Sequence, residues 1–156
     1  MTFEYERWRF RRWDTPLSSR SCVVDEAILS EGKLHIIAGD LPVESGPRVL
    51  FYFPRTLAVL VRNETFLGDL VMHWQKDWPN LSFWKVVGNT WTVEGSEWLS
   101  HFGSRRDDIS REYGPILHYG INTDDAYEIL ASVDVVIKEN RDIEQLRAEA
   151  AQLRRS

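Results

Sequence analysis

VLFYFPRTLAVLV, residues 49–61, consists of two short apolar runs separated by Pro54. Both runs are rich in β-branched and aromatic residues, which predicts two strands that are buried on both faces. The proline predicts a bend or a bulge between them, because its backbone nitrogen cannot donate to a sheet hydrogen bond. The whole chain has 156 residues, which is enough for one domain with a real core.

The residues before this stretch predict a β-hairpin. Apolar runs at 22–29 and 34–38 flank a short glycine turn at 31–32. Nearer the N-terminus, aromatic and charged residues alternate over 3–10, which predicts one strand. The alternation is lost at 11–12, so we expect this strand to end there.

The residues after the decisive stretch mix helical and extended patterns. Apolar residues at 66–74 recur with helical spacing and predict a short helix. Runs at 83–87 and 90–93 predict two strands. A second short helix is predicted between Ser96, whose hydroxyl can cap the first turn, and Gly103, which can end the helix.

The last third of the chain predicts further strands. The highly charged segment 104–113 is predicted to be a loop or an exposed turn, and 115–121 a strand. Turn-forming residues follow at 122–125. Residues 127–137 are predicted to form one or two strands, and a helix over 124–131 is the alternative reading.

The tail at 140–156 predicts an amphipathic helix. Asn140 can cap it, and acidic residues near its start and arginines near its end suit the helix dipole. Its apolar stripe consists of Ile143, Leu146, Ala150 and Leu153. The stripe is narrow, so the helix is expected either to pack on its own domain or to pair with a second copy in a homodimer.

Together these elements predict an α+β fold. The sheet is expected to be mainly antiparallel and strand-rich, sandwich- or half-barrel-like, with few short helices before the C-terminal one. The order of elements is not an alternation of strand and helix, which argues against a parallel doubly wound sheet. We expect one globular domain at 1–139 followed by the helix at 140–156.

Composition excludes several classes of protein. Apolar residues make up 43% of the chain, charged residues 28%, and the formal net charge is −5. This acidic balance argues against a nucleic-acid binder, whose affinity comes from cations on phosphates. A single cysteine excludes an internal disulfide framework. There is no apolar run of roughly 20 residues and no secretory signal pattern, so we expect no membrane span and a cytoplasmic location.

Motifs for catalysis and cofactors are absent from the sequence. There is no phosphate-binding glycine loop, CxxC, HExxH or GxSxG, so we expect no cofactor and no metal. Cys22 could act as a nucleophile if His35 approached it, but its apolar neighbours favour a core thiol. His101 and His118 flank the charged segment and, with a nearby aspartate, are the alternative catalytic candidates for a hydrolase-like enzyme.

Two groups of residues are candidates for binding a protein partner. Acidic side chains gather in the last third of the chain, and a basic partner would be drawn to them. Three tryptophans lie close in sequence beside a Pro-Asn turn, and tryptophan is enriched at the centre of interfaces. The candidate contact residues are Asp107, Asp108, Asp124, Asp125, Glu128, Trp74, Trp78 and Trp84.

Several segments resemble a known class of bacterial proteins. They are LVRNE at 60–64, GSEWL at 95–99, HYGINTDD at 118–125 and EIL at 128–130. The chain resembles the small, strand-rich immunity proteins found beside polymorphic toxins. The resemblance implies a non-enzymatic protein that binds one toxin domain and blocks its active site, with an acidic surface suited to a basic nuclease toxin.

Overall fold

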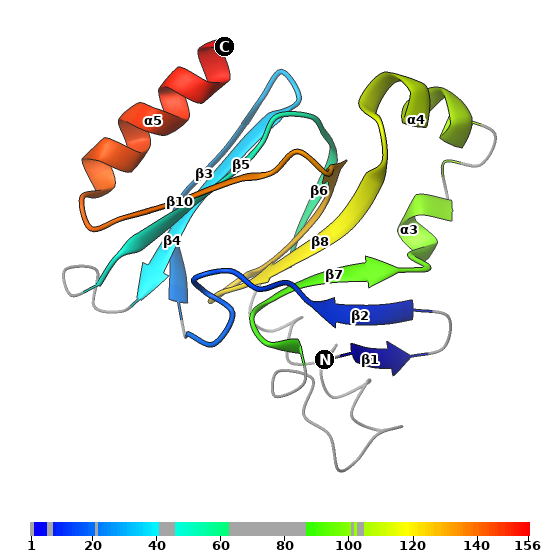
Figure 1. Ribbon diagram of the computed structural model, residues 1–156, viewed down its shortest axis with the longest axis horizontal. Coiled ribbons are helices and arrows are strands. Elements are labelled where there is room, and N and C mark those ends of the chain that lie inside the picture. Colours follow the sequence, from blue (N-terminus) through cyan, green and yellow to red (C-terminus); the bar gives the residue numbers. More distant parts are fainter. Residues whose placement is uncertain are drawn as a thin grey trace.

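The computed structural model describes residues 2–5, 8–20, 22–40, 46–62, 87–100, 102 and 105–156. Within these residues the strands form two antiparallel sheets, both open at their edges (Figure 1). The six-stranded sheet has the order β1 (Thr2–Tyr5), β2 (Trp8–Arg12), β7 (Thr90–Glu94), β8 (Ile116–Asn122), β9 (Ala126–Ser132), β6 (Thr56–Arg62). The four-stranded sheet has the order β10 (Val136–Asn140), β5 (Arg48–Phe53), β4 (Lys33–Asp40), β3 (Cys22–Ser30). The helices are α3 (Glu97–Ser100), α4 (Arg106–Tyr113) and α5 (Ile143–Arg155). The predicted α+β, mainly antiparallel fold is confirmed.

The main core lies between the two sheets. Alternate side chains of β4 and β5 pack against alternate side chains of β8 and β9, as the two-residue period of a strand requires. Buried members of this core include Ile36, Phe51, Phe53, Tyr119, Ile121 and Ile129. Trp13 closes one side, with its ring centroid 5.0 Å from that of Tyr119 and 5.5 Å from that of Phe51.

The decisive stretch forms β5 and β6, which belong to different sheets. Every residue of β5 is buried, as predicted, because the inter-sheet core covers one face and α5 the other. The prediction that 57–61 is also buried on both faces is wrong, since Leu60 and Val61 are 39% and 50% exposed. β6 is the edge strand of its sheet, so fewer neighbours cover it. A bend at Pro54 and a register shift at the start of β6 confirm the predicted interruption.

The predicted hairpin is β3–β4. Glu31 and Gly32 form its turn with φ values of 52° and 72°. Both residues are in the left-handed region, which glycine adopts more easily than other residues. The single strand predicted at 3–10 is wrong, because β1 and β2 are separate strands paired antiparallel. The alternation continues through both strands and no glycine or proline marks the reversal, so the pattern alone did not reveal it.

The segment that follows β6 is described only in part. The helix predicted at 66–74 lies outside the described residues, and so do Trp74, Trp78 and Trp84. Of the strand predicted at 83–87 the structure describes Val87, and its backbone there is helical. The strand predicted at 90–93 is β7, and Ser96 caps α3 as expected, with its Oγ accepting from the Leu99 backbone nitrogen at 3.4 Å.

The charged segment 104–113 is not the predicted loop, because its last eight residues form α4. Asp107 and Asp108 in the first turn and Arg111 in the last turn match the helix dipole. Opposite charges placed at the two ends of one helix therefore stabilise it, so a high density of charge does not by itself indicate a loop. Residues 126–132 are strand β9, which excludes the alternative helix at 124–131.

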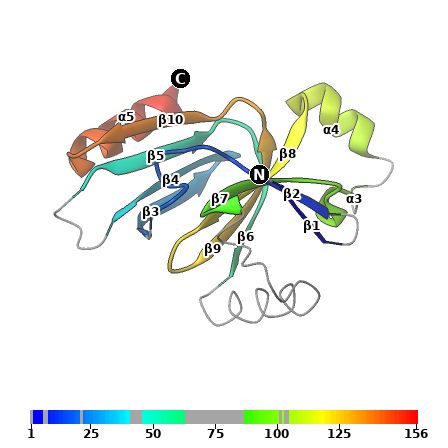
Figure 2. The same ribbon diagram turned by 60° about the horizontal axis from the view of Figure 1, so that its bottom comes forward.

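The C-terminal helix is confirmed as α5. Asp142 rather than Asn140 is its N-cap, accepting from the backbone nitrogens of Glu144 and Gln145. Leu146 and Ala150 are fully buried against the four-stranded sheet. Figure 2 shows α5 on the face of that sheet that points away from the six-stranded sheet. In the described part of the chain, no helix has the length and apolar character needed to cross a membrane.

Candidate functional site

Ser96, His118 and Glu128 form a chain of hydrogen bonds on the six-stranded sheet. Ser96 Oγ lies 2.7 Å from His118 Nδ1, and His118 Nε2 lies 3.0 Å from Glu128 Oε1. Ser96 precedes α3, His118 lies in β8 and Glu128 lies in β9. The chain of hydrogen bonds therefore joins one helix start to two neighbouring strands.

The backbone brings these residues together in a simple way. β8 and β9 form a hairpin in which His118 is opposite Leu130 and Gly120 is opposite Glu128, so His118 and Glu128 are diagonal neighbours on one face. Gly95, with φ of 72°, reverses the chain after β7 and sets Ser96 over that face. Aromatic rings enclose the imidazole: the ring centroids of Trp91 and Trp98 lie 5.9 Å and 5.4 Å from it.

This chain of groups is buried almost completely. The exposed fractions of Ser96, His118 and Glu128 are 6%, 0% and 3%. A neutral imidazole with its hydrogen on Nε2 fits the contacts: it donates to the Glu128 carboxylate and accepts the Ser96 hydroxyl hydrogen at Nδ1. Ser96 Oγ in turn accepts from the Leu99 backbone nitrogen. The arrangement satisfies buried polar atoms and ties α3 to the sheet.

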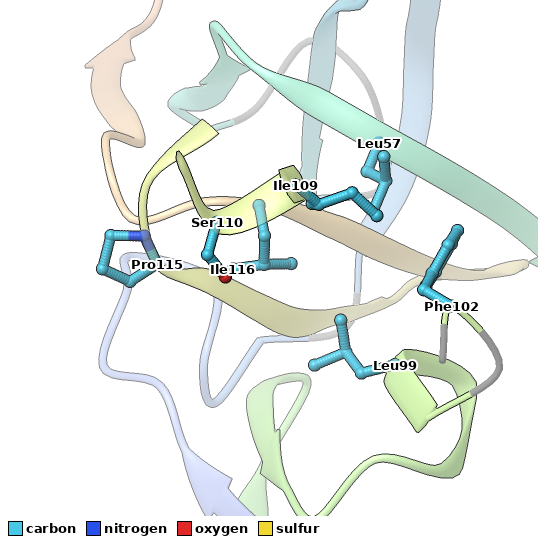
Figure 3. A pocket seen from close by; sticks show the side chains of 7 residues that line it. All are labelled: Leu57, Leu99, Phe102, Ile109, Ser110, Pro115 and Ile116. Carbon is cyan, nitrogen blue, oxygen red and sulfur yellow. The ribbon is translucent and has the colours of Figure 1, made fainter. Parts of the chain in front are cut away.

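A cleft of about 230 Å³ lies near this buried chain of groups. Figure 3 shows the side chains that line it. Its walls come from β6, α3, α4 and the start of β8. The lining residues are Leu57, Leu99, Phe102, Ile109, Ser110, Pro115 and Ile116. Leu99 links the cleft to the buried chain through its backbone bond to Ser96, and Ile116 lies two residues before His118, on the same face of β8. Among the described residues that line the cleft, Ser110 is the one with a polar side chain.

The predicted acidic residues fall in three places. Asp107 and Asp108 are exposed on α4, whereas Asp124 and Asp125 lie in the turn between β8 and β9. α4 and that turn are at opposite ends of β8 (Figure 1), so the four aspartates do not form one patch. Glu128 is buried beside His118, which removes it from the surface that a partner would contact.

The region around α4 carries charges of both signs. Arg111 Nη2 lies 3.3 Å from Asp108 Oδ1, and both side chains are well exposed. Arg105, just before the helix, is also exposed. The exposed surface of α4 is therefore mixed in charge, and not acidic as expected from the aspartates alone.

The remaining catalytic candidates whose positions are described, Cys22 and His35, are separated. His101 lies outside the described residues. Cys22 is a buried core thiol whose pKa burial raises to about 11, as the preferred reading expected. In the β3–β4 hairpin Cys22 is opposite Asp40 and His35 is opposite Ile28, so the two residues lie at different ends of the hairpin. Among the described residues, no group of three or more His, Cys, Asp or Glu is placed to hold a metal ion.

Sequence reasoning named His118 but missed its actual partners. It paired His118 with an aspartate near in sequence, whereas the structure pairs it with Glu128 and Ser96. The pairing of His118 with Glu128 could have been predicted from the sequence. Residues 116–122 and 126–132 form a hairpin around a short turn, and this places residues 118 and 128 diagonally on one face. The contact of Ser96 with His118 could not be predicted in this way, because it depends on the path of the chain after β7.

Comparison with known proteins adds no assignment. No protein-family model matches the chain, and neither a curated protein nor a solved structure matches it.

Proposed function

We propose that this protein is a non-enzymatic protein-binding domain whose partner docks at the α3–α4 cleft. The observation that carries the proposal is the composition of the cleft, whose described lining residues are apolar except for one serine. These described residues include no acid, base or metal ligand for a reaction. The cleft offers a place where a partner can bury an apolar side chain away from water.

The size and the rim of the cleft favour a protein partner over a small ligand. Its volume of about 230 Å³ is below the roughly 300–1,000 Å³ of pockets that enclose drug-sized ligands. Exposed charges of both signs, such as Asp107 and Arg111, lie on α4, the helix that contributes Ile109 and Ser110 to its wall. An apolar centre with a polar, charged rim is the usual anatomy of a protein–protein interface.

The finer form of the proposal is an immunity protein that binds and blocks a bacterial toxin in the cytoplasm. The net charge of −5 supports it, because long-range attraction speeds the encounter with a basic toxin domain even where the contact surface itself is mixed in charge. The resemblance of several segments to such immunity proteins supports the same partner class.

Capture from lysate of the source cell tests the proposal. The tagged full chain is expected to retain a stoichiometric protein, identified by mass spectrometry, and Ile109→Glu is expected to weaken that binding at least about tenfold. Leu29→Glu is the control for an added surface carboxylate, because Leu29 is an apolar residue that is 54% exposed and lies in β3 outside the cleft, whereas Ile109 is half-buried in its lining. Unchanged binding by Ile109→Glu, or equal loss in both variants, would contradict docking at the cleft.

The second candidate function is hydrolysis by Ser96, His118 and Glu128. Their serine–histidine–carboxylate order, which serine hydrolases use, is the observation that favours it. The burial of Ser96 and its bond from the Leu99 backbone oppose it. A fluorophosphonate probe separates the two functions, since it reacts with an activated serine. Labelling of the native chain that is lost in Ser96→Ala would establish the hydrolase, and the binding proposal expects none.

A further inference from the structure

Helix α5 is held on the four-stranded sheet by two different kinds of contact. Its middle is held by apolar packing, with Leu146 and Ala150 against Ile37 and Leu50. Its last turn is held by polar groups in addition to Leu153, which packs at the edge of the same apolar cluster. Lys33 Nζ donates to the backbone oxygens of Arg154 at 2.8 Å and Ser156 at 3.2 Å. The Tyr52 hydroxyl donates to the Leu153 carbonyl at 3.1 Å.

His35 lies under this last turn and contacts it directly. Its side chain is 1% exposed, with Nε2 2.8 Å from Glu26 Oε2 and Nδ1 2.6 Å from Arg154 Nη1. A guanidinium only donates hydrogen bonds, so Nδ1 must be the acceptor and carry no hydrogen. The hydrogen of a neutral imidazole is then on Nε2, where it is donated to Glu26. The observed contacts thus require the neutral form of His35.

We propose that protonation of His35 at Nδ1 releases the last turn of α5 from the four-stranded sheet. The added hydrogen removes the acceptor that Arg154 uses and faces the guanidinium with a second positive charge. The middle of the helix stays in place, because its apolar contacts with Ile37 and Leu50 do not titrate. Acid therefore loosens the C-terminal end of α5 before the fold as a whole is lost.

The charges around His35 favour this outcome. The charged and titratable side chains around His35 are Glu26 from β3, Lys33 from β4, Tyr52 from β5, and Arg147 and Arg154 from α5. Glu26 is the one carboxylate of this set, and Arg147 Nε already lies 3.6 Å from its Oε1. Protonated His35 would add a fourth cation to the three in this set, and one carboxylate compensates them poorly in a buried site.

The direction of the titration agrees with the geometry. Burial lowers the pKa of His35; the hydrogen bond to Glu26 opposes this and the charge of Arg154 adds to it. A group whose pKa is lowered in the folded state contributes stability above its unfolded pKa and loses it as the pH falls. The release is therefore expected on acidification through the ordinary histidine range, and not on making the solution alkaline.

Amide hydrogen exchange of the full chain, followed by NMR and corrected for intrinsic rates, tests the proposal. Between pH 7.5 and 5.5 the protection of residues 152–156 is expected to fall at least about fivefold. The amides of 106–113 in α4 report any general loss of stability and are expected to stay within about twofold. His35→Gln is the matched variant, because glutamine can accept from Arg154 and donate to Glu26 without titrating.

Each outcome of this experiment decides the proposal. It is supported if the pH dependence at 152–156 is lost in His35→Gln, which still contains Glu26. It is overturned if the native chain shows no fall, or if His35→Gln shows the same fall. If His35→Gln does not fold, Arg154→Met replaces it: low protection at both pH values supports the proposal, and a persisting acid-dependent fall overturns it.

Discussion

Ser96→Ala removes one hydroxyl group at the junction of α3 and the six-stranded sheet. Two hydrogen bonds are lost with it, the cap to the Leu99 backbone nitrogen at 3.4 Å and the contact with His118 Nδ1 at 2.7 Å. A helix cap contributes about 1 kcal/mol, and a buried hydrogen bond contributes about 1 kcal/mol more. We therefore expect the free energy of unfolding to fall by about 2 kcal/mol, which corresponds to roughly 4–8 °C in Tm for a chain of this length.

Urea unfolding followed by tryptophan fluorescence measures this loss, because Trp91 and Trp98 flank His118. Ser30→Ala is the control, since Ser30 is exposed at the end of β3 and its substitution should cost less than about 0.5 kcal/mol. A loss below about 0.5 kcal/mol for Ser96→Ala would refute the reasoning. It would mean that the buried chain of hydrogen bonds is not what holds α3 on the sheet.

Two further substitutions and one thiol reaction test other parts of the structure. Gly120→Ala would set a Cβ 2.0 Å from the Trp91 ring, so we expect a loss of at least about 3 kcal/mol or failure to fold, seen by circular dichroism. Leu146→Ala should lower the free energy of unfolding in urea by about 2–5 kcal/mol, because Leu146 is fully buried between α5 and the four-stranded sheet. A smaller loss would mean that α5 is loosely packed. Cys22, whose pKa is raised to about 11, should react with a thiol reagent at pH 8 only after unfolding; fast reaction of the native chain would contradict its burial.

The candidate site was predictable only in part. His118 could be selected from sequence because histidine is chemically versatile, and the hairpin that contains it could be read from the alternation of residues. Glu128 is its diagonal neighbour in that hairpin, so this pair follows from local pairing. Ser96 comes from a different part of the chain, and the apolar cleft is built from four separate elements. Neither could be derived from a local pattern.

The sequence by itself determined the local elements of this protein. Short runs of β-branched and aromatic residues mark most strands. The turn at Glu31 and Gly32 defines the β3–β4 hairpin, and the capping hydroxyl of Ser96 marks the start of α3. These features depend on backbone preferences of neighbouring residues, which a sequence displays directly. The apolar stripe that predicts α5 is of the same kind.

Only the tertiary structure decided which surfaces are covered. β5 and β6 have similar apolar sequences, yet β5 is fully buried and Val61 in β6 is half exposed. The difference arises because β5 lies between the main core and α5, whereas β6 is a sheet edge. The enclosure of His118 and the contact of His35 with Arg154 depend equally on elements far apart in the chain. Burial is set by long-range packing, and a local pattern does not contain that information.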